Sequence, residues 1–273
     1  VMKGLVLAIG TIATMFWRNL VGIGLSGALY LPRRQGWPSK STFRIHLARG
    51  VLSAGMGFLF FWGIGRVPLA QAVALAFISP LIALYLASLI LHETIGPKTI
   101  GASLVAFAGV IVIFIGQARA DLGREALIGS LAILVSAALY ALNIIIMRRQ
   151  AQVADPLEIT FFQSLIVTVV LLLVVPFAGI TVPPAGQWPL LLFAAVLAIT
   201  SMLLLSWAYA RAEASYLAAT EYTAFLWAML FGWLFFDERV SLFTLAGAAL
   251  IVAGCILAAR RPSEASPVLE AAT

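Results

Sequence analysis

The chain has 273 residues, of which 63% are hydrophobic and only 10% are charged, and its formal net charge is +6. A water-soluble globular protein is typically about half apolar and a quarter charged, so this composition excludes a soluble fold. The basic excess does not indicate nucleic-acid binding, because Lys and Arg occur singly or in pairs between long apolar runs. We therefore expect an all-α integral membrane protein, since the apolar runs are continuous instead of alternating.

Nine apolar runs are close to the ~20 residues that a helix needs to cross the hydrocarbon core. Proline marks many of the joints between them, as at Pro68, Pro97 and Pro156. In chain order, the predicted membrane helices cover residues 12–31, 43–64, 69–91, 97–116, 126–148, 157–180, 189–210, 216–236 and 240–260. Residues 263–273 are rich in Pro, Ser, Glu and Ala and are predicted to form a disordered cytoplasmic tail.

The two halves of the chain match each other when the sequence is shifted by 145 positions. The matching pairs are Phe16 and Phe161, Leu20 and Leu165, Trp62 and Trp207, Arg66 and Arg211, Glu93 and Glu238, and Gly109 and Gly254. Two of these pairs form a repeated Trp-x-x-x-Arg motif, which chance rarely produces in the same order. The pattern predicts a duplication, with residues 1–120 as a first five-helix repeat and 121–262 as a second.

The same shift places Val1 to Lys3 on the end of the predicted helix 126–148. We therefore expect that the chain starts at the tail of a first helix whose body is missing, and that the complete fold has ten helices. Because five is an odd number, the second repeat is expected to enter the membrane inverted, with a substrate site near the midplane.

Charge predicts the orientation. One set of loops holds Arg33, Arg34, Lys40, Arg44, Lys98, Arg148, Arg149, Arg211, Arg260 and Arg261. The other set holds Lys3, Arg66, Arg119, Arg124 and Arg239. The richer set is expected in the cytoplasm, together with the C-terminus, in a bacterial-type inner (plasma) membrane.

Several motifs accompany this repeat. Each half ends on an acidic corner, at Glu93 and Glu238, followed by a Gly-rich helix, and Phe77-Ile78-Ser79-Pro80 interrupts an earlier helix. With these features and Arg18, essentially the whole chain resembles the EamA type of the drug/metabolite transporter superfamily, including bacterial exporters of aromatic amino acids. The resemblance implies export of small metabolites through a central cavity. One departure is Phe225, which stands at the position equivalent to Pro80.

Arg18 lies about six residues inside a predicted helix. A basic side chain at this depth either extends to the interface or captures an acidic ligand, here a substrate carboxylate. Its repeat equivalent, Gln163, is polar and also embedded. Both are candidate substrate-binding residues.

Glu221 is the one carboxylate that the predicted boundaries place well inside a span. The two histidines, His46 and His92, fall at predicted helix ends. It is a candidate proton-coupling residue or a partner that holds helices together, and Tyr222 beside it is a further candidate for the cavity. With a single titratable candidate, we expect facilitated diffusion down the cargo's own gradient.

Aromatic side chains are abundant and could line a cavity or simply pack helices. Tyr140 and Asn143 are three positions apart and so share one helix face. Ser79 lies beside Pro80, whose helix break frees backbone carbonyls that need water or protein partners. The remaining candidates in or near helix breaks are Trp17, Trp62, Phe77 and Trp207.

These observations predict a secondary transporter that exports amino acids or similar metabolites, with preference for aromatic or apolar side chains. An exporter of drugs or nucleoside or purine-like metabolites is the alternative, and a membrane-embedded enzyme or non-transporting subunit is the alternative of another class. One Cys, two separated His and the lack of a P-loop lysine motif argue against metal chemistry and ATP hydrolysis. We expect a small-molecule substrate and the lipid bilayer as partners, without cofactor, metal or nucleic acid, and a monomer is compatible with the sequence.

Overall fold

The computed structural model describes residues 1–34, 36–79, 81–83, 85–86, 97–119, 123–209, 211 and 223–259. These residues form helices and contain no strand, which confirms the all-α class. The helices are α1 (Met2–Ile9), α2 (Thr11–Tyr30), α3 (Lys40–Ile64), α4 (Leu69–Ala76), α6 (Pro97–Arg119), α7 (Gly123–Ala151), α8 (Pro156–Ala178), the short 3₁₀ helix η1 (Ala185–Gln187), α9 (Trp188–Tyr209), α11 (Thr223–Phe236) and α12 (Leu242–Ala259).

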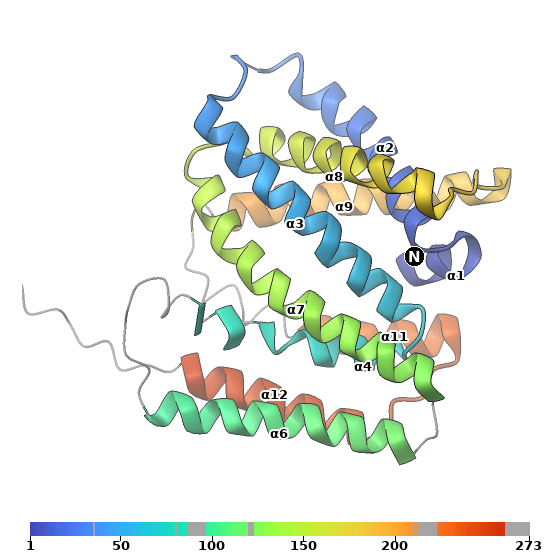
Figure 1. Ribbon diagram of the computed structural model, residues 1–273, viewed down its shortest axis with the longest axis vertical. Coiled ribbons are helices and arrows are strands. Elements are labelled where there is room, and N and C mark those ends of the chain that lie inside the picture. The colour runs from blue at the N-terminus through green and yellow to red at the C-terminus, as the bar shows by residue number, and fades with distance from the viewer. Residues whose placement is uncertain are drawn as a thin grey trace, which may run out of the picture.

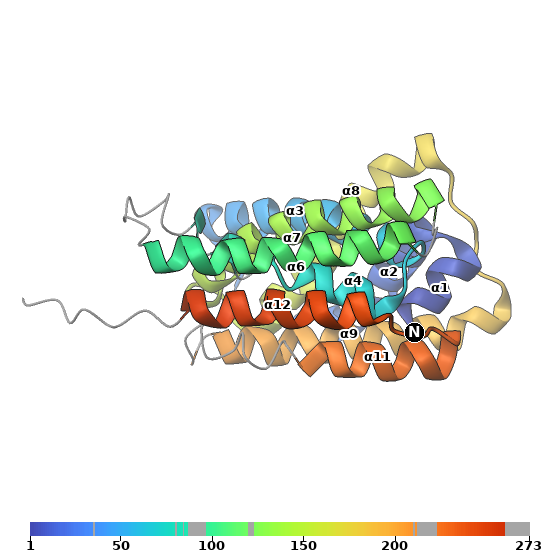
Figure 2. The same ribbon diagram turned by 90° about the horizontal axis from the view of Figure 1, so that it is seen from below.

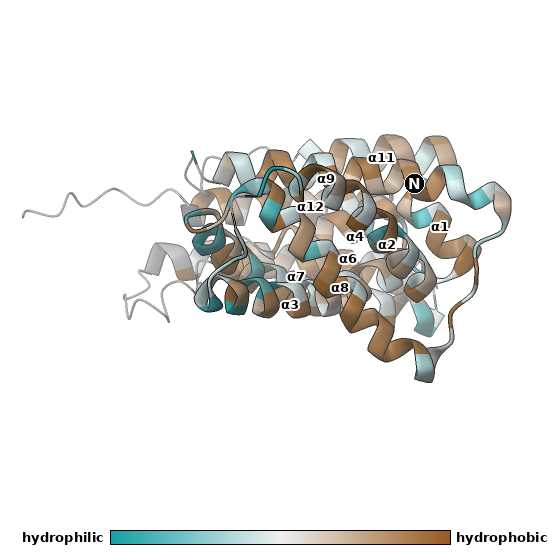
Figure 3. Cartoon of the chain, turned by 90° about the horizontal axis from the view of Figure 1, so that it is seen from above, coloured by the Kyte–Doolittle hydropathy of each residue, from teal (hydrophilic) through white to brown (hydrophobic). Residues whose placement is uncertain are grey.

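Five of the described helices are long and apolar enough to cross a membrane, namely α3, α6, α7, α8 and α9. Shorter apolar helices are found at α4, α11 and α12. In α2, Arg18 and Asn19 interrupt an otherwise apolar run of 20 residues. Hydropathy colouring shows mainly hydrophobic residues along the helices (Figure 3). Most helix positions agree with the predicted spans. Two differ: α4 ends at Ala76, whereas the prediction was 69–91, and the described part of the predicted helix 216–236 begins at Thr223.

Local capping chemistry sets several boundaries. Ser39 precedes α3, and its hydroxyl accepts a hydrogen bond from the Thr42 amide at 3.2 Å. Asp155 caps α8 in the same way, accepting from the amides of Leu157 and Glu158. Gly10 separates α1 from α2 and has a φ of 81°. Glycine suits this position because a side chain would strain a backbone with positive φ.

The helices pair across the two halves of the chain. In the ribbon views, α6 and α12 run side by side along one edge, and α3 lies diagonally against α7 (Figures 1 and 2). α2 packs on α8. In addition, α2 contacts α9, and α8 contacts α3. The largest buried cluster joins α4, α6, α7 and α12.

Small residues let α6 and α12 approach closely. A Cβ added to Gly109 would lie 2.5 Å from the Gly247 carbonyl oxygen, and one on Gly247 would lie 2.6 Å from the Gly109 carbonyl oxygen. Two turns further along α12, a Cβ on Gly254 would lie 2.6 Å from the Ala102 carbonyl oxygen. Backbones this close gain dispersion contacts along the whole interface, which is how helices associate without a hydrophobic driving force in lipid.

Candidate functional site

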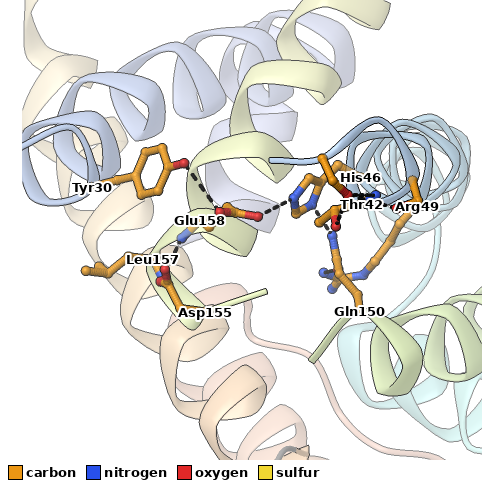
Figure 4. A network of polar contacts seen from close by, with 10 residues as sticks. Tyr30, Thr42, His46, Arg49, Gln150, Asp155, Leu157 and Glu158 are labelled. Carbon is orange, nitrogen blue, oxygen red and sulfur yellow. Dashed lines mark hydrogen bonds and ion pairs between the residues drawn. The ribbon is translucent and has the colours of Figure 1, made fainter. Parts of the chain in front are cut away.

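A buried polar network lies where α3 meets α7 and α8. Arg49 of α3 is only 3% exposed, and the Asn143 and Gln150 side chains of α7 are buried beside it. The network continues through His46 to Glu158 of α8 and reaches Tyr30 at the end of α2 (Figure 4). It therefore joins three helices of the bundle and touches a fourth.

Arg49 is held by neutral acceptors. Its Nε donates to Asn143 Oδ1 at 2.9 Å, and its Nη1 donates to Gln150 Oε1 at 2.6 Å. Nη2 points at the Met202 sulfur of α9 at 3.7 Å, which is a weak acceptor. Among the described residues no carboxylate pairs with this guanidinium. A cation is costly to bury without a counter-charge, so the site is suited to an anionic group.

His46 connects this arginine to an acidic residue. Its Nε2 lies 2.9 Å from Glu158 Oε1, and its Nδ1 lies 2.6 Å from Gln150 Nε2. The imidazole also stacks on Phe162, with centroids 4.7 Å apart and 10° between the planes. The Tyr30 hydroxyl donates to Glu158 Oε2 over a longer 3.4 Å. The imidazole is therefore fixed on both nitrogens and on one face.

Helical spacing explains why these side chains meet. His46, Arg49 and Ser53 follow one another at three and four positions on α3, so they share a face. Asn143 and Gln150 lie two turns apart on the facing stripe of α7. Asn143 Nδ2 donates to Ser53 Oγ at 2.8 Å, which extends the contact between the two stripes.

Sequence reasoning identified Asn143 but missed Arg49, His46, Gln150 and Glu158. The sequence placed His46 at the end of a predicted helix, but α3 begins earlier, at Lys40, and the imidazole is 1% exposed. The claim that Glu221 is the one titratable candidate inside the bundle was wrong for the same reason. The missed signal was the matched spacing of polar residues on two adjacent apolar helices.

Arg18 lies elsewhere on α2. Its Nη2 donates to the neighbouring Asn19 Oδ1 at 3.3 Å, and the guanidinium sits 5.7 Å from the centre of the Phe61 ring of α3. Gln163, its repeat equivalent, is half-buried on α8. Neither residue belongs to the network around Arg49.

Trp62 and Trp207 lie near the ends of α3 and α9, whereas Trp17 lies almost two turns inside α2. Trp17 Nε1 donates to the Thr181 carbonyl at 2.9 Å, and its ring meets Trp188 edge to face. The Arg66 guanidinium stacks 3.5 Å from the Trp62 ring and Nη1 donates to the Trp62 carbonyl. Both repeated motifs share this geometry, since Arg211 lies 4.7 Å from the Trp207 ring and donates to its carbonyl.

Phe77 and Ser79 belong to a different part of the bundle from Tyr140 and Asn143. Phe77 is buried in the core around α4 and faces Phe225 of α11, with centroids 6.2 Å apart. The Ser79 hydroxyl donates to the Ala76 carbonyl one turn earlier. Tyr140, by contrast, lies near Arg49, close enough to interact electrostatically. Pro80, Glu221 and Tyr222 lie outside the described residues.

Two further polar contacts lie elsewhere in the bundle. Gln71, Gln117 and Ser130 form a buried triad between α4, α6 and α7, with bonds of 3.0 to 3.2 Å. Beyond the far end of α3, Lys3 pairs with Glu238 and donates to the Val67 carbonyl at 2.7 Å. A cleft of about 470 Å³ opens at that end, lined by Gly10, Trp62, Arg66 and Thr181 among others.

Comparison with known proteins identifies the class to which this architecture belongs. The model of the EamA-like transporter family matches residues 1–115 and 127–260, so the chain belongs to that family. It is a multi-pass membrane protein of a bacterial transporter family, and its relatives are transporters, not enzymes.

Particular relatives carry transport names. The chain is 29% identical over 254 residues to the pseudopaline exporter CntI of Pseudomonas aeruginosa, covering 93% of this chain and 83% of the exporter. It is 31% identical over 216 residues to a riboflavin transporter of Rhizobium johnstonii, covering 79% and 70%. A solved crystal structure shares the fold with a TM-score of 0.62, at 19% identity and over 94% of this chain and 90% of that one.

Proposed function

We propose that this chain is a secondary transporter that exports amino acids or similar small metabolites, favouring those with aromatic or apolar side chains. The observation that carries the proposal is Arg49, a buried cation whose described partners are neutral. Amino acids bring a carboxylate that a guanidinium fork binds well, and Tyr140 nearby offers an aromatic surface to their side chains. Asn143 and Gln150 hold the guanidinium in place until the carboxylate arrives.

The transport cycle we propose is alternating access between two inverted five-helix repeats. The 145-residue shift that relates the halves carries Gly109 to Gly254 and Ala102 to Gly247, so the close contacts between α6 and α12 are reciprocal. The same shift carries α2 onto α8 and α3 onto α9, and the pairs α2–α9 and α8–α3 both pack together. Reciprocal contacts of this kind support a two-fold relation between the halves, about which one half can rock against the other.

The charge bias of the loops supports a cytoplasmic C-terminus and a cytoplasmic 33–40 loop. With that orientation, the network around Arg49 lies toward the cytoplasmic end of α3, where an exported substrate enters. Cysteine substitutions in the 33–40 loop should resist a membrane-impermeant thiol reagent in intact cells. Labelling from outside would reverse the orientation.

A second cargo class, drugs or nucleoside and purine-like metabolites, remains the alternative because two relatives are named riboflavin transporters. Such cargo does not need a carboxylate, so a requirement for the acid group separates the two classes.

The test is counterflow in proteoliposomes loaded with single unlabelled amino acids, with nucleosides as the comparison set. The parent protein should exchange labelled phenylalanine with a saturable rate, and Arg49→Gln should lower that rate at least tenfold without loss of folded protein. Arg66→Gln, which removes a half-exposed arginine paired with Glu125, is the matched control and should transport normally. Exchange of nucleosides but of no amino acid would contradict the proposal.

A further inference from the structure

The hydrogen bonds from Arg49 to Glu158 run in one direction only. A guanidinium can donate but cannot accept, so the oxygen of the Gln150 amide must face Arg49. The NH₂ group of Gln150 therefore faces His46 and donates to Nδ1 over 2.6 Å. Because Nδ1 accepts, a neutral His46 carries its hydrogen on Nε2 and donates it to Glu158 Oε1. The charge on Arg49 thus fixes the tautomer of a histidine three positions away on the same helix.

Because of this direction, His46 cannot be protonated on Nδ1 while the Gln150 oxygen accepts from Arg49. An imidazolium donates from both nitrogens, so protonation of His46 requires the Gln150 oxygen to turn toward Nδ1. The Gln150 NH₂ group would then face the Arg49 guanidinium, donor against donor, and Nη1 would lose its strongest acceptor. An unpaired donor on a buried cation is costly, unless another acceptor takes the place of Gln150. An anionic ligand on Arg49 is such an acceptor.

We propose that His46 is a proton-binding site coupled to the anion site on Arg49, so that the protein binds one proton together with one carboxylate. The inference rests on the proposed function in one respect, that the ligand of Arg49 is a carboxylate. Coupling is reciprocal, so the carboxylate favours the protonated imidazole as much as the proton favours the carboxylate.

The surroundings of His46 suit a reversible proton site. In the described part of the chain, the charged groups that interact with it are Glu158 of α8 and Arg49 of its own helix. Tyr30 of α2 bonds to the other oxygen of Glu158, and Asp155, the cap of α8, lies near Tyr30. Arg34 lies near Tyr30, and α7 contributes the uncharged Gln150. The Glu158 side chain that bonds to the buried imidazole is itself 15% exposed. A proton from the solvent adds to the Nδ1 lone pair as a new N–H bond and leaves when that bond breaks, and no other covalent bond changes.

The tautomer is tested without any ligand. Nitrogen NMR of the protein in lipid nanodiscs, carrying His92→Gln so that His46 is the one histidine, reports which imidazole nitrogen holds hydrogen. Near pH 8 the parent should show hydrogen on Nε2 and a bare Nδ1. Arg49→Gln should shift the population toward the Nδ1–H form or the imidazolium, because Gln150 is then free to turn. The matched control Arg18→Gln, another arginine within the bundle, should keep the parent spectrum. Hydrogen on Nδ1 in the parent, or an Arg49→Gln spectrum identical to it, would overturn the proposal.

The coupling is tested with L-phenylalanine as the probe. Its affinity for the purified protein should be about tenfold higher near pH 5 than near pH 8, the range over which histidine changes charge. Binding in weakly buffered solution should take up protons in that range, with a maximum of about half a proton per ligand, which is the uptake that a tenfold change in affinity requires. His46→Gln should reduce the pH effect to within about twofold, whereas His92→Gln should retain it.

The two measurements separate the possible failures. Binding of phenylalanine with no pH dependence, or with the same dependence after His46→Gln, contradicts the proton coupling while leaving the proposed function intact. A parent with the expected tautomer that binds no phenylalanine contradicts the proposed function, and with it the carboxylate as the coupled ligand.

Discussion

The two ends of α3 are both tied to the second half of the chain, but by different chemistry. Toward the Lys40 end, Arg49 bonds to the side-chain amides of Asn143 and Gln150 on α7, and His46 bonds to the Glu158 carboxylate of α8. Beyond the Ile64 end, Lys3 meets the carboxylate of Glu238, whose other oxygen accepts from the Leu69 amide at 2.7 Å. One junction holds a cation among neutral partners, and the other holds a cation with its counter-charge.

We interpret the Arg49 network as a binding site and the Lys3–Glu238 ion pair as a purely structural contact. Lys3 and Glu238 neutralise each other and use backbone groups for their remaining bonds, so that junction gains nothing from an added ion. Arg49 keeps a full positive charge that its amide partners only solvate. We therefore expect substitutions beyond the Ile64 end to act on stability and substitutions around Arg49 to act on substrate binding as well.

The largest effect on stability should come from Glu238→Ala. It leaves Lys3 buried without a counter-charge, and loss of one partner of a buried pair costs about 3 kcal/mol or more. The measurement is the thermal denaturation midpoint in detergent, with Glu125→Ala as control. Glu125 is 73% exposed in its pair with Arg66, and its loss should cost less than about 1 kcal/mol. Equal shifts of the denaturation midpoint for the two variants would contradict a structural role of the Lys3–Glu238 ion pair.

Gln150→Leu should have the next largest effect. It removes the acceptor of Arg49 Nη1 and the donor to His46 Nδ1, and each buried group left unsatisfied costs about 1–3 kcal/mol. We expect a clear loss of stability together with altered phenylalanine affinity, which separates this junction from that of Lys3. Gln152→Leu, two residues further in an exposed turn, is the control. A stability loss without any change in affinity would make Gln150 purely structural.

Tyr30→Phe should have the smallest effect. The hydroxyl bond to Glu158 is long, at 3.4 Å, so its removal should cost only about 0.5 kcal/mol. The ring should remain stacked on Phe161, whose centroid lies 5.3 Å away, and preserve the packing of α2 against α8. A destabilisation as large as that of Gln150→Leu would show that Tyr30 is an integral member of the network.

The sequence predicted the helices well because continuous apolar runs are a local signal. It also predicted that Trp62 and Trp207 are equivalent, and the shared stacking of Arg66 and Arg211 follows from a four-residue spacing along one helix. The network around Arg49 was harder, because Arg49, Gln150 and Glu158 stand on three helices and a single sequence gives no pairing between them. The sequence analysis assigned substrate binding to Arg18 because of its depth in α2. Arg49 is equally deep in α3, and its side chain is more fully buried.

The most direct test of a carboxylate site on Arg49 compares phenylalanine with phenylalaninamide, which has the same ring and amine but no acid group. Both compounds are measured as competitors of counterflow in the parent protein and in Arg49→Gln. The parent should prefer the acid by about tenfold or more, which is the contribution of a charge-assisted hydrogen bond, and Arg49→Gln should nearly abolish this preference. An equal preference for the acid in both proteins would contradict the assignment of Arg49 as the carboxylate-binding residue.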